Sequence, residues 1–303
     1  MDVAEHDEGD KTVWVYLGRD RQVRADQVPP PLMACMTLVD FMNWIGGRLV
    51  ADTTFQQLVV GTLGRSFGTF LTICETLYDG NPIQGAMLCR PLFEDVVVAH
   101  WLLYNDSDPQ WLVDRFERHR EAIALYQQKL SVMTEWGTGP SLVEDLKNVK
   151  SRQNELFKEF GSEAQRNWWD PGKNGRGEGR PIGLRGVAAI LEDVAASGVR
   201  FHPRFAGGDE PVLRRMELVV GKWFSQTIHH TALGLPVDIL GQDQPPVPAA
   251  NRSYLVAFCA FWLFAQQLYS VHELYGRATP ELDRLVYDGM KDGFGAPEDT
   301  LHW

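Results

Sequence analysis

Apolar and polar residues recur along most of this chain with the period of an α-helix. From residue 33 onward, apolar side chains return every three or four positions, as they do on the buried face of an amphipathic helix. The pattern predicts helices over residues 33–46, 54–78, 82–104, 109–135, 142–164, 183–196, 212–234, 251–275 and 280–292. Eight or nine helices joined mostly by short loops predict an all-α helical bundle.

The N-terminal region has a different pattern. Residues 12–17 alternate as a short strand does, and Gly18, Arg19 and Asp20 follow as a turn, so a short β-hairpin is expected. Three consecutive prolines, 29–31, predict an extended spacer. We therefore expect an acidic, extended segment over 1–32, a single helical domain over 33–295 and a tail over 296–303.

Glycines and prolines define the second and third long helices. The sequence Asp79-Gly80-Asn81-Pro82 predicts a turn with proline at the start of the next helix. Gly61, Gly64 and Gly68 lie inside the helix before that turn, where they either allow a close approach of another helix or mark breaks. Close packing is the interpretation we favour.

One charged pair interrupts the apolar pattern of residues 82–104. Helical spacing places Ile83, Met87, Arg90, Glu94, Val97 and Trp101 on one face. Arg90 and Glu94 are four residues apart and can pair directly on a helix. Burial of such a pair costs free energy, so a protein that buries one usually has a use for it. Arg90 then either faces a phosphate group, with Glu94 holding it in place, or forms a structural salt bridge with Glu94.

A second polar pair falls near the end of the helix expected over 212–234. Ser225 and His229 are four residues apart and share a face. A histidine near a helix C-terminus titrates close to neutral pH and is suited to general acid–base work. The alternative is a core histidine bonded to a backbone carbonyl, with the serine bonded back to its own helix.

A glycine-rich basic stretch lies between these regions. Trp168, Lys173, Arg176 and Arg180 fall in the irregular sequence 167–181. Basic side chains, exposed backbone N–H groups and an aromatic ring are features of nucleic-acid or nucleotide contacts. The spacing is not that of a P-loop, however, and a solvated loop is the simpler interpretation.

Composition limits the function classes. The formal net charge of −11 argues against broad attraction to nucleic acid or anionic lipid, although it allows a local basic site. The sequence contains no HExxH motif and no GxGxxG motif after a strand, so we expect no metal site and no cofactor. Four scattered cysteines predict buried thiols in a reduced, cytoplasmic protein. The longest apolar run, 255–265, predicts a core helix rather than a membrane span.

The motifs resemble those of a bacterial all-helical family of unknown function. Members carry Arg-x-x-x-Glu on a helix near their first third and Ser-x-x-x-His near their end, as Arg90–Glu94 and Ser225–His229 do here. That family is similar in style to the HEPN-like helical bundles, many of which are metal-independent ribonucleases of toxin–antitoxin and phage-defence systems. Their usual motif places histidine five to seven residues after arginine on one helix, and this chain has no such pair.

The resemblance implies a helical protein with a polar pocket lined by Arg90, Glu94, Ser225 and His229. In a ribonuclease of a defence or stress system, His229 would be the acid or base and Arg90 would stabilise phosphorane-like charge. Such an enzyme needs Arg90 and His229 in contact from two helices. RNA or a nucleotide is then the partner. The alternative is a non-enzymatic interaction or scaffold protein in which these residues are structural and apolar helices form a homodimer.

Overall fold

The structure is a computed structural model. It describes residues 14–17, 21–104, 117, 144, 147–148, 150–152, 154–155, 204–205, 216–224, 249–276, 279–297 and 301–302. Ser225 and His229 lie outside the described residues, as do Trp168, Lys173, Arg176 and Arg180. The helices expected over 109–135, 142–164 and 183–196 also lie wholly or largely outside them.

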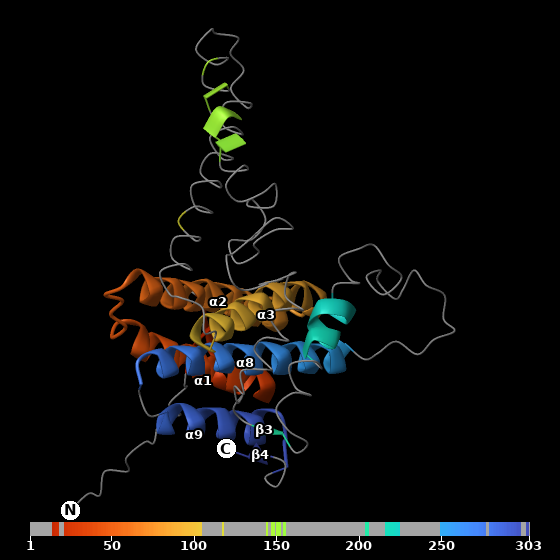
Figure 1. Cartoon of the computed structure of the whole chain (residues 1–303). Coiled ribbons are helices and arrows are strands. Elements are labelled where there is room, and N and C mark those ends of the chain that lie inside the picture. The colour runs from red at the N-terminus through yellow and green to blue at the C-terminus, as the bar shows by residue number, and fades with distance from the viewer. Residues whose placement is uncertain are drawn as a thin grey trace, which may run out of the picture. The chain divides into compact units, whose positions relative to one another are not determined.

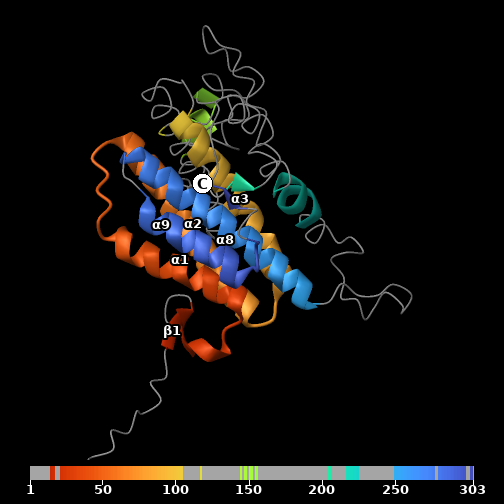
Figure 2. The same ribbon diagram turned by 90° about the horizontal axis from the view of Figure 1, so that it is seen from below.

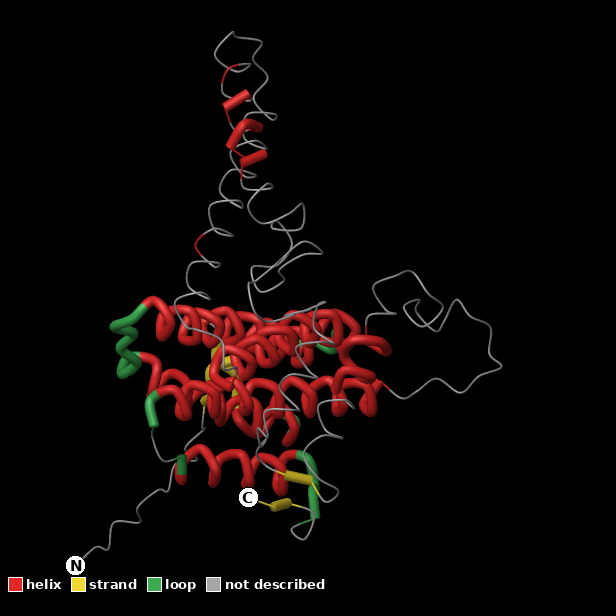
Figure 3. The backbone as a smooth tube through the Cα atoms, in the orientation of Figure 1, coloured by secondary structure: helices red, strands yellow, loops and turns green. Residues whose placement is uncertain are grey.

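The described residues confirm an all-α protein with a short N-terminal hairpin (Figure 3). The α-helices are α1 (Pro30–Gly46), α2 (Thr54–Tyr78), α3 (Pro82–Tyr104), α8 (Ala249–Leu274) and α9 (Pro280–Asp288). Two π-helical segments, η2 (Glu217–Phe224) and η5 (Gly289–Gly293), bring the helices in the described residues to seven, not the eight or nine expected. A 3₁₀ turn, η1 (Ala25–Gln27), precedes α1.

The strands are short. β1 (Trp14–Leu17) pairs antiparallel with β2 (Arg21–Arg24), and Val15 lies opposite Val23. β3 (Arg204–Phe205) pairs antiparallel with β4 (Leu301–His302) near the end of the chain. The first of these is the hairpin that the sequence predicts at this place.

By its contacts the chain divides into two compact units, one of residues 1–51, 58–103 and 199–303 and one of residues 52–57 and 104–198. This division cuts across the single helical domain expected over 33–295. The expected boundaries stay a prediction, because compact units need not fold independently. The helices of the first unit lie in layers, with α2 beside α3, then α1 beside α8, and α9 beyond them (Figure 1).

Helix α8 is the centre of the first unit. Its residues 260–265 are all fully buried. The thiol of Cys35 on α1 contacts the Ala257 carbonyl oxygen at 3.7 Å, and the thiol of Cys89 on α3 contacts the Val256 carbonyl oxygen at 3.9 Å. From α2, the Phe70 ring stacks on Phe264 with ring centroids 4.4 Å apart. Figure 2 shows α1, α8 and α9 running side by side.

The turn between α2 and α3 forms as its sequence predicts. Gly80 has a φ of +76°, a conformation that glycine adopts without strain. The Asn81 N–H donates to the Thr76 carbonyl oxygen and the Gly80 N–H to the Leu77 carbonyl oxygen, which together form a Schellman motif. Pro82 then begins α3, where its missing N–H costs nothing.

Two local expectations are wrong. Pro30 and Pro31 are not part of an extended spacer but form the first turn of α1, where a proline needs no hydrogen-bond partner for its nitrogen. Gly61, Gly64 and Gly68 neither break α2 nor pack closely, since a Cβ at any of them meets no described atom within 4 Å. All three lie on an open face of the helix.

Helix α8 is also longer than its apolar run suggests. By length and composition alone, the segment of residues 252–274 is long enough and apolar enough to span a bilayer. In the structure, 83% of its most apolar window is buried inside the protein, as in the core helix of a globular domain. All four cysteines are free and buried.

Candidate functional site

The Arg90–Glu94 pair forms, but it lies on the surface. Arg90 Nε donates to Glu94 Oε1 at 3.2 Å within α3. The Arg90 side chain is 46% exposed and that of Glu94 is 34% exposed. The expectation that this pair lies on a buried stripe is therefore wrong: beside it the buried residues are Cys89 and Phe93, although Val97 and Trp101 of the expected face are buried. The contact expected between Arg90 and His229 stays a prediction.

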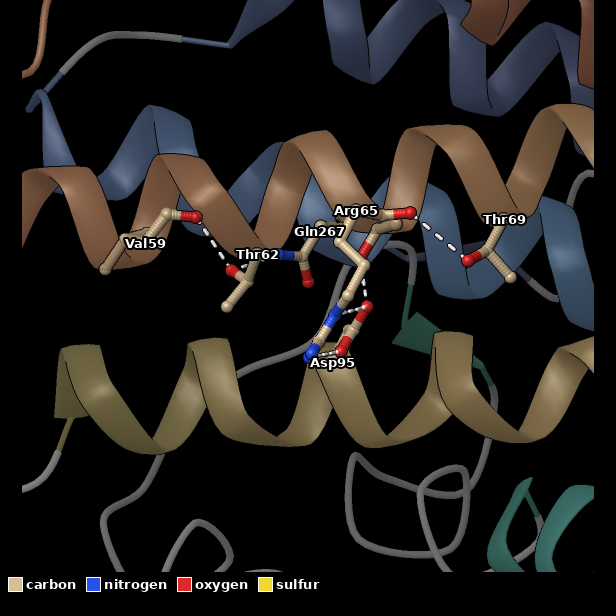
Figure 4. A network of polar contacts seen from close by, with 7 residues as sticks. Val59, Thr62, Arg65, Thr69, Asp95 and Gln267 are labelled. Atoms are coloured by element: carbon tan, nitrogen blue, oxygen red, sulfur yellow. Dashed lines mark hydrogen bonds and ion pairs between the residues drawn. The ribbon is translucent and has the colours of Figure 1, made fainter. Parts of the chain in front are cut away.

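The buried carboxylate of α3 is that of Asp95, the residue after Glu94. Its side chain is 2% exposed, whereas that of its partner Arg65 on α2 is 61% exposed. Arg65 Nε donates to Asp95 Oδ2 at 3.0 Å, and Arg65 Nη2 donates to Asp95 Oδ1 (Figure 4). The two bonds form a fork-to-fork pair that fixes the plane of the guanidinium group.

The charge of Asp95 is only partly compensated. Burial raises the pKa of the Asp95 carboxyl, and the hydrogen bonds from Arg65 and Ser66 counteract part of that rise. Ser66 is fully buried, and its hydroxyl donates to Asp95 Oδ2 at 3.2 Å. The carboxylate thus accepts three hydrogen bonds from one turn of α2, and these hold α2 to α3.

A second polar contact lies one turn earlier on α2. Gln267 on α8 is fully buried, and its Nε2 donates to the Thr62 hydroxyl at 2.9 Å. The Thr62 hydroxyl donates in turn to the Val59 carbonyl oxygen at 2.7 Å. In the view of Figure 4 the Gln267 amide lies between Thr62 and Arg65. Gln267 Oε1 has no hydrogen-bond partner among the described residues.

Arg65 retains hydrogen-bonding capacity on its outer edge. A guanidinium group has five N–H donors, and Asp95 uses the Nε edge. The Nη1 group has no partner in the described part of the chain. Gly61, Gly64 and Gly68 lie on the same open face, so no side chain at those positions covers the approach to Arg65. We refer to Arg65 with these three glycines as the Arg65 face.

A buried histidine lies further along α3. His100 Nδ1 contacts the Val96 carbonyl oxygen at 2.9 Å and the Ser270 hydroxyl of α8 at 3.1 Å. The Ser270 hydroxyl donates to the Gln266 carbonyl oxygen, so the histidine nitrogen carries the proton in both of its contacts. Burial lowers the pKa of His100 to about 4. The ring is therefore neutral at pH 7 and its role is to join α3 to α8.

The sequence contains one signal that could have indicated Asp95. It is an acidic residue directly before the apolar run 96–99, where a solvated carboxylate is not expected. Its partner could not be identified in this way, because Arg65 is thirty residues away on another helix. Among the described residues no group of three or more His, Cys, Asp or Glu side chains could hold a metal ion.

Comparison with known proteins adds no identity. No family model, curated protein or solved structure matched the chain.

Proposed function

We propose that this chain is a helical binding protein that takes a phosphate-bearing ligand, a nucleotide or RNA, on the Arg65 face. The observation that carries the proposal is the pair between an exposed guanidinium and a buried carboxylate. The buried partner fixes the arginine, and its free edge is directed away from Asp95. A fixed guanidinium loses less conformational entropy when it binds the paired oxygens of a phosphate.

The surroundings of Arg65 support the same ligand class. Gly64 and Gly68 leave the backbone of α2 open beside the guanidinium, so a bulky phosphate meets no Cβ. The formal net charge of −11 repels an extended polyanion from the rest of the protein. A nucleotide or a short RNA end therefore fits this face better than a long duplex does.

Binding is testable with a variant that keeps the fold. Arg65→Lys retains a cation for Asp95 but loses the planar fork, so we expect affinity for a fluorescent ATP analogue and for a labelled single-stranded RNA to fall about tenfold. Arg24→Lys is the matched control, because Arg24 makes the same two-bond fork to Asp26 at the exposed end of β2, outside every proposed site. Equal loss in both variants, or no binding by the unaltered protein, contradicts the proposal.

Cleavage of RNA is a further step that rests on the resemblance to HEPN-like bundles. In this proposal the chain is a metal-independent ribonuclease of a defence or stress system, with His229 as acid or base beside Ser225, Arg90 and Glu94. Total RNA incubated with the pure protein, with Arg90→Ala and His229→Ala as controls, tests it. Cleavage that survives both substitutions removes this assignment, and binding without cleavage leaves the Arg65 face as a binding site.

A second candidate, an interaction or scaffold protein, is favoured by one observation. The Arg90–Glu94 pair is a surface pair within a single helix, a geometry that needs no ligand to explain it. In this proposal Arg65–Asp95 only holds α2 to α3. The binding experiment separates the two candidates, because a scaffold shows no difference in phosphate affinity between Arg65→Lys and Arg24→Lys.

A further inference from the structure

A cavity lies between α1 and α9, on elements that take no part in the Arg65 face. Its volume is about 490 Å³, within the range of small-molecule sites. Asp40, Phe41 and Trp44 line it from α1, and Glu281, Arg284 and Asp288 line it from α9. On each helix these positions follow the spacing of one face, so the cavity is a groove between two helix faces. We call it the α1–α9 groove.

Two aromatic rings form part of the groove wall. Phe41 is buried and stacks on His272 of α8 with ring centroids 5.8 Å apart, which fixes its position. Trp44 is 50% exposed, a high value for the largest apolar side chain. The Arg48 guanidinium carbon lies 4.2 Å from the centroid of the Trp44 ring. This ring therefore already holds one cation of the protein by a cation–π contact.

The charges of the groove are unbalanced. Asp288 faces Arg284 of its own helix at 3.6 Å. Asp40 and Glu281 have no ion pair among the described residues, although both line the cavity. Partial burial raises the pKa of the Asp40 carboxyl, and no neighbouring cation counteracts that rise. The wall therefore presents two uncompensated carboxylates next to an aromatic surface.

We propose that the α1–α9 groove binds a small organic cation, an amine or guanidinium carried on a short alkyl chain. The carboxylates of Asp40 and Glu281 bind the charge, and Phe41 and Trp44 contact the alkyl chain and the cation. The lining of each helix extends over about two turns, roughly 10 Å, which suits a small molecule better than a docked helix. An anion is repelled, and a bare metal ion gains nothing from the aromatic wall.

Agmatine is a suitable probe because it carries a guanidinium and an amine on a four-carbon chain. We expect isothermal titration calorimetry to detect its binding to the full chain, and Asp40→Asn to weaken that binding about tenfold. Trp44→Leu should weaken it severalfold by removing the cation–π contact. Asp292→Asn is the matched control, because it removes the same charge from an exposed residue of η5 outside the groove.

Each outcome bears on the proposal. Equal loss of affinity in Asp40→Asn and Asp292→Asn means that only net charge attracts the probe, which overturns it. Binding of neutral 1,4-butanediol as tight as that of agmatine overturns the role of charge. Displacement of agmatine by Mg²⁺ at equal concentration overturns the organic character of the site. If the titration shows no heat of binding up to about 10 mM agmatine, the proposal of a cation site in the groove is overturned. Thermal melts of every variant identify any that fail to fold.

Discussion

Glu94 and Asp95 are consecutive carboxylates on α3, yet they belong to different environments. Glu94 is partly exposed and pairs with Arg90 of its own helix. Asp95 is buried and pairs with Arg65 of α2. A helix turns by about 100° per residue, which is enough to move a side chain from solvent into the core. The position of a charge relative to the helix face thus decides whether a salt bridge holds two helices together.

The energies of the two pairs should differ accordingly. Exposed pairs four residues apart on a helix contribute about 0.3–0.5 kcal/mol. Loss of the partner of a buried charge costs several kcal/mol, because the remaining charge has lost its water as well as its partner. The four predictions below run from the largest expected effect to the smallest, and the first and last of them test this contrast directly.

Arg65→Ala should lower the free energy of unfolding by about 2–3 kcal/mol, because Asp95 stays buried without its cation. Urea denaturation at pH 7 measures this change. The deficit should shrink as the pH falls, because loss of Arg65 raises the pKa of Asp95 in the folded state and the carboxyl then binds a proton. A deficit below about 0.5 kcal/mol would mean that Asp95 behaves as a surface carboxylate.

His100 should make the stability of the protein fall between pH 6.5 and 4. The pKa of His100 is about 4 in the folded state, against an ordinary value of 6.5. As the pH falls, the unfolded chain therefore binds the proton at a higher pH than the folded protein does. The contribution of His100 to the free energy of unfolding is fully present above pH 6.5. It decreases as the pH falls, by about 2–3 kcal/mol at pH 4. His100→Gln should lack this part of the pH dependence in denaturation curves, and an unchanged slope contradicts the burial of His100.

Gly64→Ala and Gly68→Ala should each stabilise the protein by about 0.5–1 kcal/mol, because both lie inside α2 with open space around them. The same substitutions should weaken phosphate binding if the Arg65 face is the binding surface. Gly289→Ala is the opposite case, since its Cβ would lie 2.5 Å from the Phe261 ring. Stabilisation by Gly289→Ala as well would contradict the packing of η5 against α8.

Arg90→Ala should change the free energy of unfolding by less than about 0.5 kcal/mol. Glu94→Ala should do the same, and the double variant should differ little from the sum of the two. The double-mutant cycle for Arg65 and Asp95 should give a much larger coupling energy. Equal coupling energies for the two pairs would remove the contrast between the faces of α3.

Local signals in the sequence predicted much of the fold. The bounds of α2 and α3 were predicted at the observed residues, because Asp79-Gly80-Asn81-Pro82 ends one helix and begins the next. The start of α1 was missed by three residues because prolines can indicate either an extended segment or a helix start. The choice between these depends on the packing of the following turn, which local sequence does not contain.

The candidate site was less accessible to prediction. Apolar spacing placed Arg90 and Glu94 on the buried stripe, although Cys89 and Phe93, one position away, are the buried residues. The apolar residues of α3 surround much of the helix, so period alone does not fix its inner face. Arg65 could not be recognised at all, since its role depends on a carboxylate brought to it by the packing of α2 on α3.

The buried cysteines allow the opening of the core to be measured by chemical labelling. Burial raises the pKa of the Cys89 thiol, and it raises the pKa of Cys259 to about 12, so these two side chains hold almost no thiolate at pH 7. Alkylating reagents react with thiolate, and they can reach these sulfurs only when α8 separates from its neighbours. The rate of labelling therefore reports how often the centre of the bundle opens, without any engineered probe.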